Sequence, residues 1–248
     1  MLGLLFAVAV WAGAQNALAG GGSFVTLPAL ILSGLDARAA NIASTIALFP
    51  GQVTTGWVGR RMVSGVAGLS FKVLVGLSLA GGAVGAALLL LTPSTFFAHL
   101  VPWLVLFATA LFAWGSFVRR PAAAGPRLGT RGAAAVQFLI ALYGGYFGGG
   151  IGFLMLAALT AAGLAVRVAG ATKNVLASIM NAAAVAIFLF TPGIPWLRIG
   201  VLAIGAMIGG YLGARALRRI DERIIRAFVV LLGVVLTVSL FLRQTHGA

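Results

Sequence analysis

The segment ALAGGGSFVTLPALILSGLDAR, residues 17 to 38, places three consecutive glycines, Gly20 to Gly22, inside an apolar stretch. Glycine in a helix interior costs about 1 kcal/mol relative to alanine, so a run of three predicts irregular backbone. A second segment, YFGGGIGFLMLAALTAAGLAVR, residues 146 to 167, has the same glycines, the same apolar run and the same basic end. The sequence therefore predicts one kind of apolar element that is broken twice.

The composition places most of the chain in lipid. Of its 248 residues, 61% are hydrophobic and 8% are charged, and the mean hydropathy is +1.12. Such a chain has more apolar surface than one soluble core covers, which is typical of an all-α polytopic membrane protein. The formal charge of +14 comes from basic residues between the apolar runs. Orientation and anionic lipid explain this pattern, so we expect the lipid bilayer as a partner and no nucleic acid.

The apolar runs predict about eight transmembrane elements, because one spanning helix needs about 20 apolar residues. Two long runs, residues 2 to 34 and 132 to 164, contain the glycine clusters. The six ordinary runs lie near residues 40 to 59, 70 to 91, 99 to 118, 171 to 191, 197 to 217 and 224 to 242.

The two halves of the chain repeat each other. A shift of 129 residues superposes glycine, leucine and arginine residues of the two broken segments, and Gly20 falls on Gly149. A shift of 128 superposes the glycines of a later helix in each half. We interpret the chain as a duplicated four-element unit. Residues 1 to 118 form the first repeat, residues 119 to 131 a basic cytoplasmic linker, and residues 132 to 248 the second repeat.

The basic residues indicate that the repeats are inverted. In the first half the connection after the second element is basic, and the connection after the third has no Lys or Arg. In the second half the corresponding connections hold one Arg and five Arg. Because basic connections face the cytoplasm, equivalent connections lie on opposite sides of the membrane. The alternative is a parallel duplication of eight spans in which the first helix of each half is kinked.

Breaks at matching positions of two halves predict a central substrate site. Irregular backbone survives at membrane depth only where it is buried in protein or lines a cavity, and free N–H groups at the start of the next half-helix favour an anion. The alternative is that the glycines serve only close helix packing, which explains those of the later helices well. The candidate substrate-binding residues in the breaks are Gly20, Gly21, Gly22, Ser23, Gly148, Gly149 and Gly150.

A polar cluster follows each break. ANIASTIALFPGQ in the first half aligns with GATKNVLASIMN in the second, and adds the candidates Ser44, Thr45, Thr172, Lys173 and Asn174. Polar residues at this place line a cavity or cap the helix start. An ammonium among apolar residues is usually functional, although a lysine near a helix end also snorkels to the interface.

The inventory of ionisable residues limits the function. The chain has no Cys, two His and three acidic residues, so we expect no metal, no cofactor and no enzyme active site. With almost no carboxylate in the membrane, the expected substrate is a small anion. Asp36 is the candidate for ion coupling, unless it only ends the preceding helix or pairs with Arg38. The sequence does not determine the oligomeric state, and it allows a homo-oligomer.

These motifs resemble the TauE/SafE family of sulfite exporters, also described as four-TMS sulfite, sulfonate or organosulfur permeases. The resemblance lies in GGGSFVTLPALILSGLDARAANIASTIALFPG and in the degenerate GGGIGFLMLAALTAAGLAVRVAGATKN. It implies a multi-pass permease of the bacterial inner membrane that moves sulfite, sulfonates such as sulfoacetate, or related small organic anions. In the second half Ile151 stands in register with Gly22 and Ala157 with Pro28, which implies unequal roles for the two halves. A passive anion channel and a non-transporting scaffold or assembly subunit are the alternatives.

Overall fold

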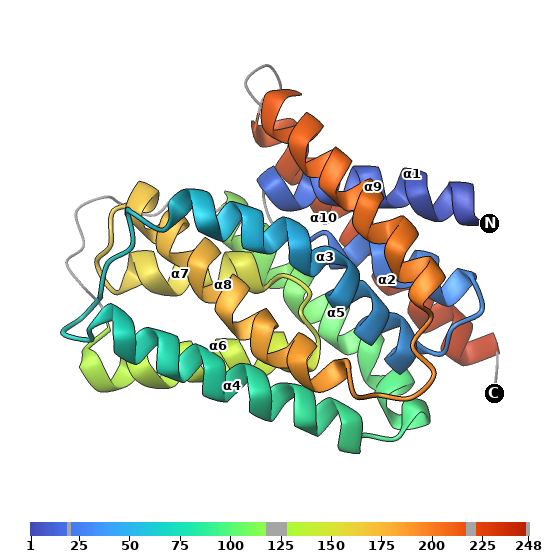
Figure 1. The fold of residues 1–248 in the computed structure, drawn as a ribbon, viewed down its shortest axis with the longest axis horizontal. Helices are drawn as coiled ribbons and strands as arrows, with labels where there is room; N and C mark the ends of the chain where they lie inside the picture. The colour runs from blue at the N-terminus through green and yellow to red at the C-terminus, as the bar shows by residue number, and fades with distance from the viewer. Residues whose placement is uncertain (19–20, 118–127, 217–221, 247–248) are drawn as a thin grey trace.

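The computed structural model describes residues 1 to 18, 21 to 117, 128 to 216 and 222 to 246. This part of the chain is built from ten α-helices and contains no β-sheet (Figure 1). In chain order they are α1 (Leu2–Leu18), α2 (Ser23–Leu32), α3 (Ala37–Gly59), α4 (Phe71–Leu91), α5 (Ser94–Phe117), α6 (Thr130–Tyr146), α7 (Ile151–Ala161), α8 (Val166–Phe188), α9 (Trp196–Ala216) and α10 (Glu222–His246).

Each of the two long apolar runs is interrupted at its glycine cluster. The first run forms α1 and α2, and the second forms α6 and α7. Gly21 has a φ of +86° and Gly150, its counterpart under the 129-residue shift, has a φ of +75°. Side chains other than glycine rarely adopt this left-handed backbone, so the glycines permit the chain to turn out of one helix and into the next. Each run is therefore a pair of helices, with a left-handed glycine in the described part of each break.

The helices of the two halves match in order, length and packing. α1 to α5 have 17, 10, 23, 21 and 24 residues, and α6 to α10 have 17, 11, 23, 21 and 25. α1 packs along α9, and α6 packs along α4, so the first helix of each half lies against the fourth helix of the other half. α3 packs against α8, and α5 against α10. If each helix is replaced by its counterpart in the other half, the same set of contacts results.

Corresponding helices of the two halves run in opposite directions (Figure 1). α3 runs from the right of the view to the left, whereas α8 runs from the left to the right. α4 and α9 are opposed in the same way, as are α1 and α6.

Glycines bring the paired helices into backbone contact. A Cβ atom on Gly85 of α4 would lie 2.1 Å from the carbonyl oxygen of Leu142 in α6. On Gly209 of α9 it would lie 1.8 Å from the carbonyl oxygen of Val10 in α1. No side chain fits at these distances, so these glycines serve the close packing that the sequence suggests for them.

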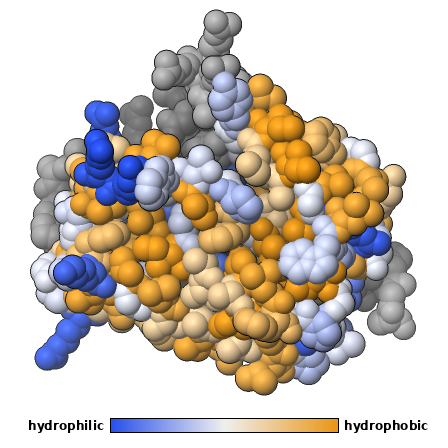
Figure 2. All heavy atoms as spheres, in the orientation of Figure 1, coloured by the Kyte–Doolittle hydropathy of each residue, from blue (hydrophilic) through white to orange (hydrophobic). Residues whose placement is uncertain are grey.

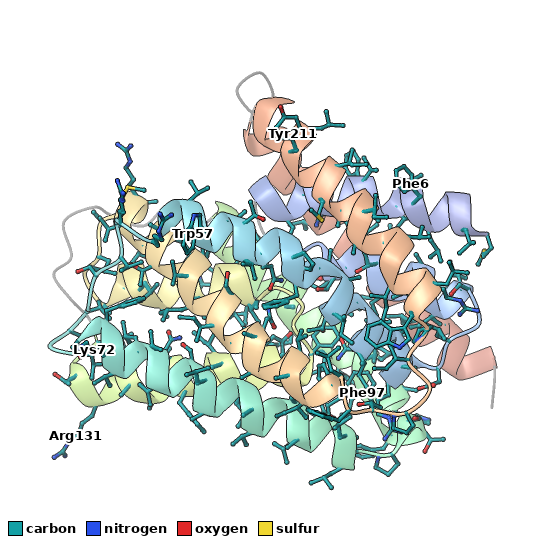
Figure 3. The ribbon with its side chains drawn as sticks, viewed as in Figure 1. Phe6, Trp57, Lys72, Phe97, Arg131 and Tyr211 are labelled. Atoms are coloured by element: carbon teal, nitrogen blue, oxygen red, sulfur yellow. The ribbon has the colours of Figure 1, made fainter. Side chains whose placement is uncertain are left out.

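Basic side chains gather at one end of the molecule, and apolar ones cover its flank. Lys72 and Arg131 lie at the left of the view, at the starts of α4 and α6 (Figure 3). Apolar residues cover most of the face in Figure 2, and large ones are widely exposed, Phe190 at 90% and Leu91 at 80% among them. Within the described residues, three helical stretches are long and apolar enough to cross a membrane: Phe71–Leu91, Ser94–Leu111 and Val166–Phe188.

Candidate functional site

The two glycine breaks meet at a small cavity inside the helix bundle. Its volume is about 40 Å³, and it is lined by residues of both breaks and by polar residues of the helices that cross beside them. The lining residues are Asn16, Gly21, Ser23, Gln52, Thr55, Gly148, Ile151, Gly152, Lys173, Asn174 and Ala177.

Two helix N-termini contribute to this cavity. Ser23 is the first residue of α2, and Ile151 and Gly152 are the first two residues of α7. The first N–H groups of an α-helix have no partner within the helix, and the helix dipole adds a partial positive charge there. Two such ends converging on one cavity form a place suited to an anion.

The breaks are held by side-chain amides that bind backbone carbonyl groups. Gln15 Nε2 donates a hydrogen bond of 3.2 Å to the carbonyl oxygen of Gly21, and Gln15 is buried. Asn41 Nδ2 of α3 donates one of 3.0 Å to the carbonyl oxygen of Tyr146, the last residue of α6. These two hydrogen bonds satisfy one carbonyl group in each break.

The two breaks also touch each other through an aromatic ring. Phe24 of α2 is buried, and its ring lies 3.2 Å from the place of a Cβ atom on Gly149 and 3.4 Å from that of one on Gly150. A larger residue would first collide with the ring of Phe147 at Gly149, 2.6 Å from the Cβ position, and with Ala108 at Gly150, 2.9 Å away, and the Phe24 ring lies just behind both. The second glycine run is therefore needed for contact between the breaks as well as for its left-handed turn.

Lys173 is the one charged residue among those that line the cavity. It lies in the first half of α8, within the stretch Val166–Phe188, which is long and apolar enough to cross a membrane. Among the described residues, its ammonium group has no ion pair and no hydrogen bond. The cavity thus combines one ammonium, two helix N-termini and the amides of Asn16, Gln52 and Asn174, and it contains no carboxylate.

A wider groove continues from this cavity toward the basic end of the molecule. It has a volume of about 420 Å³ and shares Asn16, Thr55 and Asn174 with the small cavity. Its other lining residues come from α1, the second half of α3 and the second half of α9: Gly13, Leu48, Gly51, Thr54, Val58, Ala206, Met207, Gly210 and Tyr211. Tyr211 marks its outer part, beyond the middle of α9 (Figure 3).

Five of the predicted substrate-binding residues line the small cavity: Gly21, Ser23, Gly148, Lys173 and Asn174. Gly22, Gly149 and Gly150 lie in the same two breaks but do not line it. Gly20 lies outside the described residues.

The other candidates do not line the cavity, although Thr45 Oγ1 lies 3.8 Å from the Cβ position of Gly148. Ser44 is hydrogen-bonded to Thr26 at 2.6 Å, and Thr45 donates to the backbone of its own helix. Thr172 is fully buried and accepts a bond of 3.2 Å from the N–H of Ser64. Each of these three side chains therefore has a hydrogen-bond partner that does not line the cavity.

Asp36, the candidate for ion coupling, caps α3 at the end opposite to Lys72 and Arg131. Its carboxylate accepts hydrogen bonds from the N–H groups of Arg38 (3.0 Å) and Ala39 (3.1 Å). It lines a separate cavity of about 370 Å³ between α2, α5 and α10. It is therefore not brought to the two breaks.

Sequence reasoning omitted Asn16, Gln52 and Thr55 from the candidate residues. Asn16 carries a detectable signal, since it is an amide within an apolar helix just before a glycine break. Gln52 is aligned with Asn181 by the 129-residue shift, and in the structure the Asn181 amide donates to Gln52 Oε1. Two residues that are counterparts in the two halves thus contact each other beside the cavity.

Comparison with known proteins gives the family. A family model described as sulfite exporter TauE/SafE matches residues 5–240, which confirms the resemblance seen in the sequence. The probable membrane transporter protein ORF9 of Sinorhizobium sp is 29% identical over 255 residues, which cover 99% of this chain and 94% of that protein. The probable membrane transporter protein YfcA of Escherichia coli is 26% identical, over 100% of this chain and 91% of its own. A probable membrane transporter protein of Haemophilus influenzae is 27% identical, over 98% of this chain and 96% of that protein. The chain therefore belongs to the sulfite exporter TauE/SafE family of membrane transporters.

Proposed function

We propose that this protein is a permease that binds small anions in the cavity between the two breaks and carries them across the bacterial inner membrane. The observation that carries the proposal is the convergence of the α2 and α7 N-termini with Lys173 on one cavity whose lining holds no carboxylate. Each helix N-terminus is equivalent to about half a positive charge, so the three features together favour one or two negative charges. Sulfite, sulfonates and related organosulfur or organic anions are the substrates that fit this charge and the description of the family.

The proposal includes an inverted duplication of residues 1 to 118 and 132 to 248, joined by the basic linker 119 to 131. Three observations support it. Left-handed glycines occur in register at Gly21 and Gly150, and again at Gly34 and Gly163. The helices match in order and length, and the packing pairs are reproduced when the halves are exchanged. Corresponding helices run in opposite directions (Figure 1).

Cysteine labelling tests this topology, because the chain has no cysteine of its own. Single cysteines at Arg61 and Arg219 should both be protected from an impermeant thiol reagent outside the cell. A cysteine at Gly193, in the connection between α8 and α9, should be labelled from outside. Labelling of only one of the two arginine positions from outside would support a parallel duplication instead.

Uptake into proteoliposomes tests the function. The purified protein should be reconstituted and offered sulfite, sulfate, thiosulfate, sulfoacetate and acetate as labelled anions. We expect saturable uptake of at least one of them, with empty liposomes as the control. Flux that rises linearly with concentration would favour a passive anion channel, and absence of flux for all five would favour a scaffold or assembly subunit.

A further inference from the structure

The groove between α3 and α9 is open, whereas the corresponding place between α8 and α4 is closed. Under the 129- and 128-residue shifts, Gly51 and Gly210 of the groove correspond to Met180 and Gly82. A Cβ atom on Gly82 would lie 2.5 Å from the carbonyl oxygen of Met180, so α4 and α8 are in direct backbone contact. A Cβ atom on Gly51 would have no neighbour within 4 Å, and one on Gly210 would have only the carbonyl oxygen of Gly13, at 3.8 Å. The α3–α9 pair is therefore separated at the place where the α4–α8 pair is closed.

The two pairs point to opposite ends of the molecule. The groove runs along the second halves of α3 and α9, which lead to the basic connections around Arg61 and Arg219. The closed pair runs along the second halves of α4 and α8, which lead to connections with few basic residues: residues 92 to 99 hold no Lys or Arg, and residues 189 to 198 hold only Arg198. By the positive-inside rule, the groove opens to the cytoplasm and the closed pair faces outward.

The closed end is fastened by Arg38. Its Nη1 atom donates hydrogen bonds to the carbonyl oxygens of Leu90 (3.2 Å) and Thr92 (2.9 Å), at the end of α4. The hydroxyl of Tyr146, the last residue of α6, adds a bond of 3.3 Å to Thr92 Oγ1. Bonds from a charged donor to carbonyl oxygens are the stronger kind, so they hold the end of α4 to α3.

From this asymmetry we infer that the α4–α8 contact closes an outward pathway, and that the hydrogen bonds of Arg38 to the end of α4 keep this pathway closed. Two units of like structure have two equivalent arrangements, in which the open and the closed pair exchange roles. In the second arrangement Gly210 packs on Gly51, the cytoplasmic groove closes, and α4 leaves α8. The outward pathway is then lined by counterparts of the groove residues, including Ala177, Met180, Ala183, Ala184 and Ile187. This inference rests on the proposed permease function.

Matched cysteines report the two pathways separately. Thr55 lines the groove, and its counterpart Ala184 is fully buried in the closed pair. In inside-out vesicles, Thr55→Cys should react with an impermeant maleimide. In intact cells, Ala184→Cys should react slowly from outside, and about tenfold faster once Arg38→Gln is added, the shift expected for loss of a charge-assisted hydrogen bond. Ala183→Cys, the counterpart of Thr54, serves as a second reporter if Ala184→Cys is poorly inserted.

Arg198→Gln is the matched control. Arg198 lies at the same end, but its Nη1 atom donates to Ser33 Oγ at 3.1 Å and not to α4. Its loss should leave the labelling of Ala184→Cys at the native rate.

An exchange of the open and the closed helix pair predicts one further result, which a simple loosening of α4 does not predict. If a bulky maleimide is first attached to Thr55→Cys from the cytoplasmic side, the groove cannot close, and Ala184→Cys should lose its outside labelling even with Arg38→Gln. Outside labelling that persists after this block would overturn the exchange. So would an Ala184→Cys that stays unreactive with Arg38→Gln in a protein that takes up anions in liposomes, a result that would leave the proposed function standing.

Discussion

Replacing Gly150 by leucine should abolish anion uptake while the protein still inserts into the membrane. Gly150 has a φ of +75°, and its Cβ atom would lie 2.9 Å from Ala108 Cβ and 3.4 Å from the ring of Phe24. The leucine therefore forces the turn before α7 out of its left-handed conformation and moves the α7 N-terminus away from the cavity. Uptake in proteoliposomes and the amount of folded protein in detergent should be measured together.

Gly76→Leu is the control for the added bulk. Gly76 lies in the second turn of α4, is exposed, and has no atom within 4 Å of its Cβ position. We expect this variant to transport at the native rate. Similar, small losses in both variants would show that the glycine run at residues 148 to 150 serves packing only.

Replacing Lys173 by glutamine should weaken anion binding about 5- to 150-fold, which corresponds to about 1–3 kcal/mol for the loss of a charge-assisted hydrogen bond. Lys173 is the single charged residue in the cavity lining, so its removal leaves only helix N-termini and neutral side chains around the anion. Lys173→Arg should restore part of the affinity, because a planar guanidinium does not occupy the place of a compact ammonium. The KM for uptake and the dissociation constant by calorimetry are the quantities to measure.

Lys72→Gln provides the matched control, since Lys72 is an exposed lysine at the basic end of α4 (Figure 3). Its neutralisation should leave the KM unchanged. An unchanged KM in Lys173→Gln as well would mean that the Lys173 ammonium plays no part in binding, and that the two helix N-termini hold the anion alone.

The local sequence was sufficient to predict the two breaks, but it was not sufficient to predict which residues line the cavity. Three glycines in an apolar run have a large local cost, so their effect on the backbone is readable at Gly20 to Gly22 and at Gly148 to Gly150. Thr172, Lys173 and Asn174 are adjacent in sequence, yet successive helix residues point about 100° apart. Lys173 and Asn174 line the cavity, whereas Thr172 faces Ser64. Only the packing of α8 against its neighbours decides which of the three faces inward.

The repeat alignment likewise could not predict the difference between the halves. Gly82 and Gly210 are equivalent in sequence, but one touches a backbone carbonyl group and the other lines an open groove. This difference comes from the positions of α4 and α9 relative to their neighbours, which two residues equivalent in sequence do not reveal. Asp36 gives a second example: a carboxylate near a break suggests coupling, but two backbone N–H groups bind it as a helix cap.

Protection of a cysteine at Ser23 tests most directly the claim that an anion binds between the two breaks. Ser23 lines the cavity at the start of α2, and Thr95 lines the separate cavity beside Asp36. Each should be replaced singly by cysteine, and its rate of alkylation in purified protein measured against increasing concentrations of a transported anion, with sulfoacetate tried first. We predict that the anion slows alkylation of Ser23→Cys, with half-protection at a concentration close to the KM for uptake, and leaves Thr95→Cys unaffected. An anion that is taken up saturably but does not slow alkylation of Ser23→Cys at any concentration would contradict the account.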